Sequence, residues 1–110
     1  MGTIRNEMTI VHDWNQDKIK KLRQDALQTF CESIKYDDMI SPIMTSYINQ
    51  EYTFIINGDC SKLGWEPSKR FHDIRMKWCE DHKHDAESIV VINFGEDGPC
   101  EIIYDNNGGE

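Results

Sequence analysis

The chain contains no lysine or arginine after Lys83. All 12 basic residues lie in the first 83 residues, where 13 of the 20 acidic residues nearly balance them, so the last quarter carries most of the formal charge of -8. Such a concentration of negative charge argues against direct binding to nucleic acid or to an anionic membrane, and it favours a basic protein partner. We expect the acidic side chains of this quarter to bind that partner: Asp85, Glu87, Glu96, Asp97, Glu101 and Asp105.

Long apolar segments are also missing. The longest clear apolar run, residues 89–92, is far shorter than the ~20 residues that span a bilayer, and the first residues contain no signal-peptide segment. The four cysteines are widely spaced, and without an export signal a reducing compartment keeps them as thiols. We therefore expect a cytoplasmic protein with reduced cysteines and no cofactor.

Two long helices are predicted from the spacing of apolar residues. After Asn15, which can cap a helix, apolar residues recur at steps of three and four for about five turns. The other face of this helix holds the one lysine-rich patch of the chain. A second helix is predicted to begin at residues 66–67, with Pro67 at its first position, and to end within residues 81–84. A shorter helical or irregular piece is expected between them, through residues 39–47.

Strands are predicted at residues 8–12, 52–56, 88–94 and 100–105. The third is apolar on both faces, which is typical of a central strand covered on both sides. In the last strand we expect Cys100, Ile102 and Tyr104 to share one face. One core cluster should contain the larger apolar side chains of these segments, namely Phe30, Phe54, Trp78, Ile89, Val91 and Phe94.

These elements indicate an α/β protein of the α+β sandwich kind. We expect a small mixed sheet of about four strands with two long helices packed on it, in the order β-α-(α)-β-α-β-β. Residues 1–105 should form one domain, because no linker or repeat divides them, and residues 106–110 should form a flexible tail.

The best candidates for a metal site surround the end of the second helix. Cys79 and His82 are three residues apart and would share a helix face, a spacing that zinc sites use, and Cys60 and His84 could complete the set. His72 lies two helical turns before Cys79, which is too far to bind the same ion. Because no second closely spaced pair exists, we expect a buried thiol and solvated imidazoles, and no metal.

No motif in the chain names a reaction, since glycine-rich phosphate loops and a signature for a cysteine nucleophile are both lacking. Size and charge resemble those of stoichiometric inhibitors such as bacterial immunity proteins, an analogy of composition alone. We expect a non-enzymatic acidic protein that occupies the basic surface of a nucleic-acid-handling protein. The alternatives are a small zinc-binding protein that uses Cys79 and His82, and a small enzyme with its site between sheet and helices.

Overall fold

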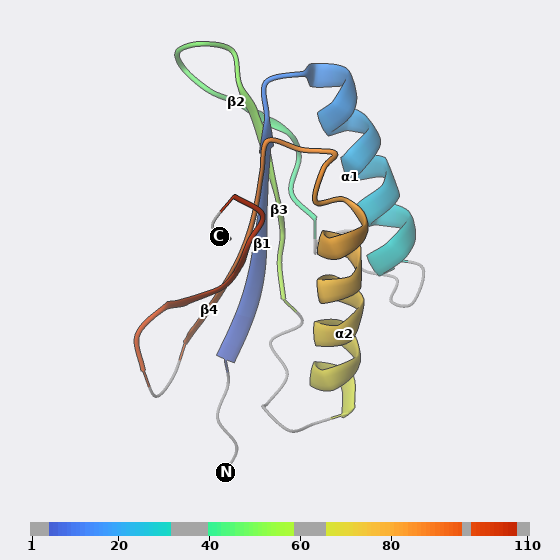
Figure 1. The fold of residues 1–110 in the computed structure, drawn as a ribbon, viewed down its shortest axis with the longest axis vertical. Coiled ribbons are helices and arrows are strands. Elements are labelled where there is room, and N and C mark those ends of the chain that lie inside the picture. The colour runs from blue at the N-terminus through green and yellow to red at the C-terminus, as the bar shows by residue number, and fades with distance from the viewer. Residues whose placement is uncertain (1–4, 32–39, 59–65, 96–97, 108–110) are drawn as a thin grey trace.

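The computed structural model describes residues 5–31, 40–58, 66–95 and 98–107. The elements follow in the order β1 (Arg5–Asp13), α1 (Gln16–Cys31), β2 (Met44–Thr45), β3 (Tyr52–Ile56), α2 (Glu66–Asp81), β4 (Ser88–Gly95) and β5 (Glu101–Asp105). The strands form one sheet in the order β2-β3-β1-β4-β5, and both helices pack on the same face of it (Figure 1). The predicted α+β class is confirmed. The expected mixed sheet of four strands is wrong in detail, because the described part contains five strands and every neighbouring pair is antiparallel.

The start of α1 is fixed by two side chains. The Asn15 side chain accepts a hydrogen bond from the backbone N–H of Lys18 at 3.1 Å, which confirms the predicted cap. The buried carboxylate of Asp13 accepts from the N–H of Asn15 at 2.8 Å and from the N–H of Glu87 at 3.0 Å. Asp13 therefore ties the beginning of α1 to the beginning of β4, and this fixes where α1 lies on the sheet.

The piece expected through residues 39–47, helical or irregular, contains no helix over the described residues 40–47, which are irregular apart from a bridge at Ile40 and the short strand β2. Pro42 has no backbone N–H to continue a helix. The backbone N–H of Ser41 donates to the carbonyl of Ile55 at 2.9 Å, and the hydroxyl of Ser41 accepts from the N–H of Ile55 at 2.8 Å. The segment is thereby held beside β3 and supplies the short edge strand β2.

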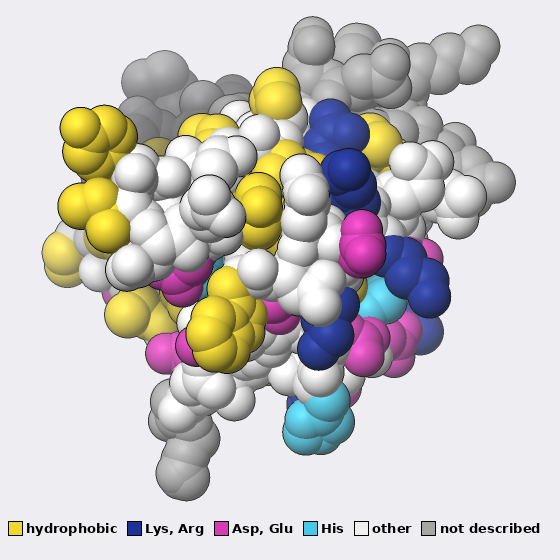
Figure 2. Space-filling view, turned by 90° about the horizontal axis from the view of Figure 1, so that it is seen from above, with side chains coloured by type: hydrophobic (Ala, Val, Ile, Leu, Met, Phe, Trp, Pro, Cys, Tyr) yellow, Lys and Arg dark blue, Asp and Glu magenta, His cyan; other side chains and the backbone are white. Residues whose placement is uncertain are grey.

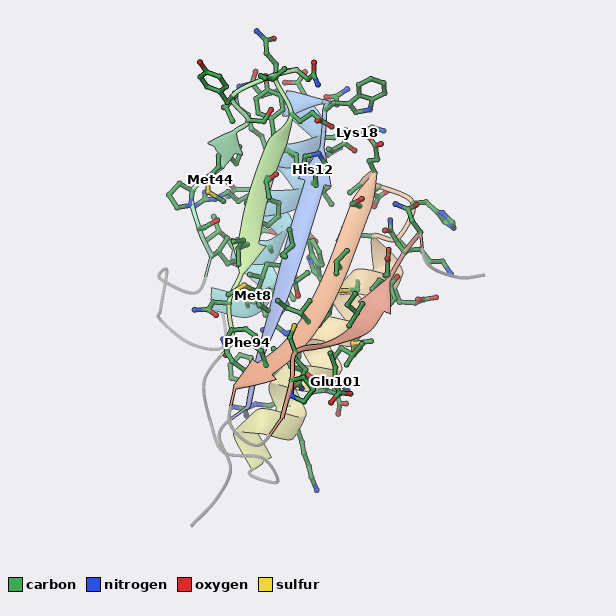
Figure 3. The ribbon with its side chains drawn as sticks, turned by 90° about the vertical axis from the view of Figure 1, so that its left-hand side faces the viewer. Met8, His12, Lys18, Met44, Phe94 and Glu101 are labelled. Carbon is green, nitrogen blue, oxygen red and sulfur yellow. The ribbon has the colours of Figure 1, made fainter. Side chains whose placement is uncertain are left out.

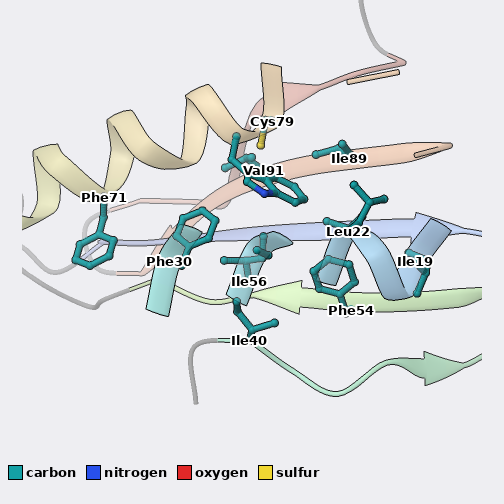
Figure 4. Packing of buried hydrophobic residues seen from close by; sticks show 13 residues of the cluster. Ile19, Leu22, Phe30, Ile40, Phe54, Ile56, Phe71, Cys79, Ile89 and Val91 are labelled. Carbon is teal, nitrogen blue, oxygen red and sulfur yellow. The ribbon is translucent and has the colours of Figure 1, made fainter. Parts of the chain in front are cut away.

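The core lies between the two helices and the sheet, as Figure 4 shows. Five of the six predicted core residues are buried there, and Phe94 is the exception because it is only half-buried and lies outside the cluster. Phe94 follows Ile89 and Val91 by an odd number of residues, and side chains alternate along a strand. It must therefore point to the opposite face of the sheet from those two residues.

That opposite face carries no helix within the described residues, so the expectation that β4 is covered on both sides is wrong there (Figure 3). Strand pairing identifies the side chains that share this face, because partners directly across an antiparallel pair point the same way. We call this surface the open face. It is made by Asn6, Met8, Ile10 and His12 of β1, Met44 of β2, Thr53 and Ile55 of β3, Ser88, Val90, Ile92 and Phe94 of β4, and Ile102 and Asp105 of β5.

A bulge separates two side chains that we expected on one face of β5. Ile102 lies opposite Ile92, whereas Tyr104 lies opposite Val91, so β5 has one extra residue at this point. Tyr104 consequently turns toward the helices, where its hydroxyl donates to the carbonyl of Cys79 at 3.3 Å. Ile102 remains on the open face and is 68% exposed.

Ordered contacts continue just beyond β5. The side chain of Asn106 accepts from the N–H of Ile89 at 2.9 Å and donates to the carbonyl of Lys83 at 3.0 Å. The expected division into a domain of residues 1–105 and a tail of residues 106–110 stays a prediction. Within the described residues, no helix combines the length and the apolar character needed to cross a membrane.

Candidate functional site

A pocket of about 370 Å³ lies between α1 and the segment that follows α2. Figure 2 looks onto this end of the molecule, where charged and histidine side chains gather on the helix side and hydrophobic side chains on the sheet side. A neighbouring pocket of about 500 Å³ shares Asp25 and His82 with the first. The first pocket is lined by Lys18, Lys21, Leu22, Asp25, His82, His84 and Asp85.

His82 lies between two carboxylates. Its Nε2 is 2.6 Å from Oδ2 of Asp25 on α1, and its Nδ1 is 2.8 Å from Oδ2 of Asp85. A carboxylate can only accept, so an imidazole with a proton on each nitrogen satisfies both contacts. The His82 side chain is 20% exposed, whereas that of Asp85 is 56% exposed. The Asp25 side chain, on the other side of the ring, is 43% exposed, so Asp85 is the more exposed of the two carboxylates.

Trp78 contacts both members of the Asp25–His82 pair from the side of the core. The buried indole donates its Nε1–H to the same Oδ2 of Asp25 at 3.1 Å, and its ring centroid is 4.6 Å from that of His82. The indole also packs against Phe30 in the core at 6.4 Å. The polar pair is thus anchored to the hydrophobic core through Trp78.

The local sequence explains how His82 reaches this place. The N–H of His82 donates to the carbonyl of Trp78 at 3.1 Å, which continues the last turn of α2. The N–H of Asp85 then donates to the carbonyl of His82 at 2.8 Å and closes a tight turn. The turn brings the Asp85 carboxylate back to the imidazole. His82 and its partner Asp85 therefore both belong to the short segment after α2.

Lys18 and Lys21 supply positive charge on the α1 side of the pocket. They are three residues apart, so they project from one face of the helix, and both are exposed. Lys20 lies on the same helix, also exposed, and does not line the pocket. Only part of the lysine-rich face of α1, Lys18 and Lys21, therefore lines this pocket.

The structure separates the six acidic residues of the expected partner site. Asp85 belongs to the pocket, and Glu87 and Asp105 lie at one end of the sheet, where Asn107 donates to the carbonyl of Glu87 and to the carboxylate of Asp105. Glu101 is at the other end of β5, and residues 96–97 lie outside the described residues. Their common role in binding a basic protein stays a prediction.

The proposed zinc ligands are not brought together where they are described. Cys79 is buried, and burial raises the pKa of its thiol to about 12, although the Arg75 guanidinium opposes the shift. Zinc binds the thiolate, which is scarce under these conditions. His82 is directed to the carboxylates, His84 is exposed, and Cys60 lies outside the described residues. Within the described part of the chain, no group of three or more His, Cys, Asp and Glu side chains is arranged to hold a metal ion.

His72 is also accounted for by a protein contact. Its Nδ1 is 2.6 Å from Oε2 of Glu7, whose other carboxylate oxygen lies 3.6 Å from Nε of the buried Arg75. Arg75 donates to the hydroxyl of Thr9 at 2.7 Å and to the carbonyl of Ile56 at 2.9 Å. This group of charges joins α2 to β1 and β3, and we interpret it as a structural contact.

Comparison with known proteins yields one similar structure to report. No protein-family model matches the chain, and no curated protein sequence matches it. A solved structure of a phage SAM lyase in complex with S-methyl-5'-thioadenosine aligns with 93% of this chain and 92% of its own, at 16% sequence identity and a TM-score of 0.44. This similarity is too low to assign the reaction of that protein to this chain.

The expected non-enzymatic inhibitor of the immunity-protein type is contradicted by this comparison, because the similar structure is that of an enzyme. The inhibitor prediction relied on a count of charged residues in the sequence. A count of carboxylates does not show which of them the protein uses internally, and Asp85 and Asp25 are both engaged with His82. We do not propose the inhibitor function further.

Proposed function

We propose that the protein is a small enzyme that binds a small anionic molecule in the pocket between α1 and the end of α2. The observation that carries the proposal is a histidine held between two carboxylates in a pocket that also contains two lysines. His82 would act as the general acid, and Lys18 and Lys21 would hold the anionic group. The pocket volume of about 370 Å³ is within the usual range for small-molecule sites.

The lysines favour a ligand with a phosphate or carboxylate group. Two ammonium groups on one helix face can both approach such a group, and hydrogen bonds between ions are roughly twice as strong as those between neutral groups. A ligand held by Lys18 and Lys21 would lie in the same cavity as His82, because all three residues line it.

The contacts of His82 favour proton donation. Asp25 is fixed by Trp78 and would keep the imidazole oriented through Nε2, while Asp85, which is more than half exposed, would leave Nδ1 when the ligand enters. The Nδ1 proton would then face a leaving group or a developing negative charge on the ligand. Positioned general acids of this kind contribute typically about 10²–10⁴-fold to rate. Asp25 has the role of a positioning residue.

We also propose that the protein is cytoplasmic. Cys79 and Cys100 are free thiols, one buried and one exposed, and this supports the cytoplasmic location expected from the sequence.

Calorimetric titration tests the ligand class. The probes are inorganic phosphate, adenosine 5'-monophosphate, and S-methyl-5'-thioadenosine, which carries no anionic group and is the ligand named with the similar structure. We expect adenosine 5'-monophosphate to bind more tightly than S-methyl-5'-thioadenosine. The double variant Lys18→Ala/Lys21→Ala should weaken its binding by roughly tenfold, because two charged contacts are lost.

Lys20→Ala is the matched control, since it removes the same charge from the same helix outside the pocket. It should leave the affinity within about twofold of the parent value, because screening limits its long-range effect. Preferential binding of the uncharged nucleoside, or equal losses in the control and in the double variant, would contradict an anion site at Lys18 and Lys21.

A further inference from the structure

A threonine, a histidine and a glutamate are in contact on the open face, on the side of the sheet away from the helices. His12 on β1 lies directly opposite Thr53 on β3, and partners across an antiparallel pair point the same way. Oγ1 of Thr53 is 2.7 Å from Nδ1 of His12, and Oε1 of Glu51 is 2.9 Å from Nε2 of the same ring. Figure 3 looks onto this face and labels His12.

The two partners of His12 determine which nitrogen of the neutral ring carries the proton. A carboxylate can only accept, so the proton is on Nε2 and is donated to Glu51. Nδ1 then has a lone pair, which accepts the hydroxyl proton of Thr53. This arrangement is the opposite of that at His82, where both nitrogens face carboxylates. His12 is therefore placed as a base beside a hydroxyl group.

Glu51 is held in place by the turn between β2 and β3. The backbone N–H of Glu51 donates to the hydroxyl of Ser46 at 2.9 Å, and the N–H of Ser46 donates to the carbonyl of Glu51 at 2.8 Å. The side chains of His12 and Glu51 are 29% and 33% exposed, so both are accessible from solvent. A hydroxyl group, a base within hydrogen-bond reach and a third group that orients the base are the parts of an activated nucleophile.

We propose that Thr53, His12 and Glu51 form a second site, which transfers the acyl group of a neutral carboxylic ester to Thr53 and then to water. Nδ1 of His12 accepts the hydroxyl proton while Oγ1 of Thr53 bonds to the carbonyl carbon of the ester. The bond from this carbon to the alcohol oxygen breaks, and the alcohol leaves with the proton from His12. Water then attacks the acyl group with His12 again as base, which releases the carboxylic acid and restores the Thr53 hydroxyl. Thr53 and His12 are the catalytic residues, and Glu51 is a positioning residue.

The surroundings favour an ester that is uncharged and has an apolar acyl chain. Met44 lies directly opposite Thr53 on β2, and Ile55 is two residues further along β3 on the same face, about 7 Å away. These side chains can contact the acyl chain. Glu51 and Asp105 place carboxylates at this face, and no lysine or arginine is among its described side chains, so an anionic phosphate ester would be repelled. The proposal does not depend on the function of the pocket, because the helices that form the pocket cover the other side of the sheet.

Hydrolysis of p-nitrophenyl butyrate by the full chain tests the proposal, together with labelling by an alkyl fluorophosphonate, which reacts with activated hydroxyl groups. We expect peptide mass mapping to find the label on Thr53. Thr53→Val keeps the shape of the side chain without the hydroxyl, so it should lose the label and lower kcat/KM at least about 100-fold. Thr53→Ser keeps a hydroxyl group and should retain both properties. His12→Gln removes the base and should lower kcat/KM as far as Thr53→Val does.

Glu51 is tested as a positioning residue with kcat expressed per labelled chain, so that a loss of folded protein does not enter the rate. Glu51→Ala should lower kcat by about tenfold and leave KM within about twofold, because only the orientation of His12 is lost. Glu51→Gln should recover most of this loss, since its amide oxygen can still accept from Nε2. An unchanged kcat in Glu51→Ala would contradict the role of Glu51.

Thr45→Val is the matched control for the nucleophile. Thr45 is an exposed threonine on β2 that faces the other side of the sheet, because it pairs with Tyr52 rather than with Thr53. Its replacement removes the same hydroxyl group and should leave the label and kcat/KM within about twofold of the parent values. A parent chain that hydrolyses the ester no faster than buffer, a label on a residue other than Thr53, or equal losses in Thr45→Val and Thr53→Val would each overturn the proposal.

Discussion

Oδ2 of Asp25 lies 2.6 Å from Nε2 of His82, and this contact connects two residues that are distant in the sequence. Asp25 is on α1, whereas His82 directly follows the last residue of α2. The contact exists only because both helices pack on the same face of the sheet, side by side. It converts two ordinary surface side chains into a fixed polar pair at the edge of the core.

Loss of the Asp25 carboxylate should destabilise the protein. Asp25→Ala removes the acceptor of the buried Trp78 indole N–H and one partner of His82, so we expect the free energy of unfolding to fall by about 1–3 kcal/mol. Asp25→Asn should lose less, since its amide oxygen can still accept from the indole. Urea denaturation measures both changes. The exposed Asp73 on α2 is the control, and if Asp73→Ala costs as much as Asp25→Ala, the Asp25 contacts are not important for stability.

The core assignment predicts different results for two tryptophans. Trp78 is 3% exposed and contacts Phe30, so Trp78→Ala should lower the free energy of unfolding by about 3–5 kcal/mol. Trp14 is 71% exposed, and Trp14→Ala should cost less than about 0.5 kcal/mol. Thermal melting compares the two variants directly. A melting temperature for Trp78→Ala within a degree or two of the parent would show that this face of α2 is not part of the core.

Local patterns predicted the helices well because their signals are short-range. Asn15 identifies the start of α1 by the hydrogen bond that it makes, and the apolar stripe identifies the buried face. The faces of the strands were harder to predict, since a shift of one residue along a strand moves every side chain to the opposite face of the sheet. Phe94 was predicted in the core although its odd spacing from Ile89 places it on the other face. The bulge in β5 that separates Ile102 from Tyr104 could not be predicted, because no turn residue in the sequence marks it.

The candidate site could not be predicted from spacing, because it depends on packing between helices. Asp25 lies on the helix face opposite the apolar stripe, and His82 was expected to be a solvated imidazole at the end of the second helix. Neither position alone indicates the other. One physical signal was available. A buried indole nearly always finds an acceptor for its N–H, so Trp78 in the predicted core implied a polar group beside it. That acceptor is Asp25, and it marks the pocket.

Cys79 and Cys100 should differ in reactivity. Burial raises the pKa of the Cys79 thiol to about 12, so almost no thiolate is present at pH 8, whereas Cys100 is exposed. Alkylation by iodoacetamide followed by peptide mass mapping should show Cys100 modified at least about tenfold faster than Cys79. Equal rates in the folded protein would contradict the buried position of Cys79.

The same thiol should make stability depend on alkaline pH. The folded-state pKa of about 12 is above the ordinary value of 9.0, so the unfolded chain loses this proton first. The contribution of Cys79 is therefore constant below about pH 9 and is lost as the pH rises toward 12. The free energy of unfolding of Cys79→Ala should accordingly fall less between pH 9 and pH 11 than that of the parent. Parallel curves in urea denaturation would be inconsistent with the raised pKa.

The indole N–H resonance of Trp78 provides the most direct test of the proposed pocket. Trp78 donates to the carboxylate that holds His82, so a ligand that enters beside His82 must change the environment of this proton. In a two-dimensional ¹H–¹⁵N titration with adenosine 5'-monophosphate, we expect a saturable shift of the Trp78 indole signal in the parent and in Lys20→Ala. We expect roughly tenfold weaker saturation in Lys18→Ala/Lys21→Ala. An indole signal that does not move at millimolar ligand, or that saturates equally in the double variant, would contradict an anion-binding site at His82.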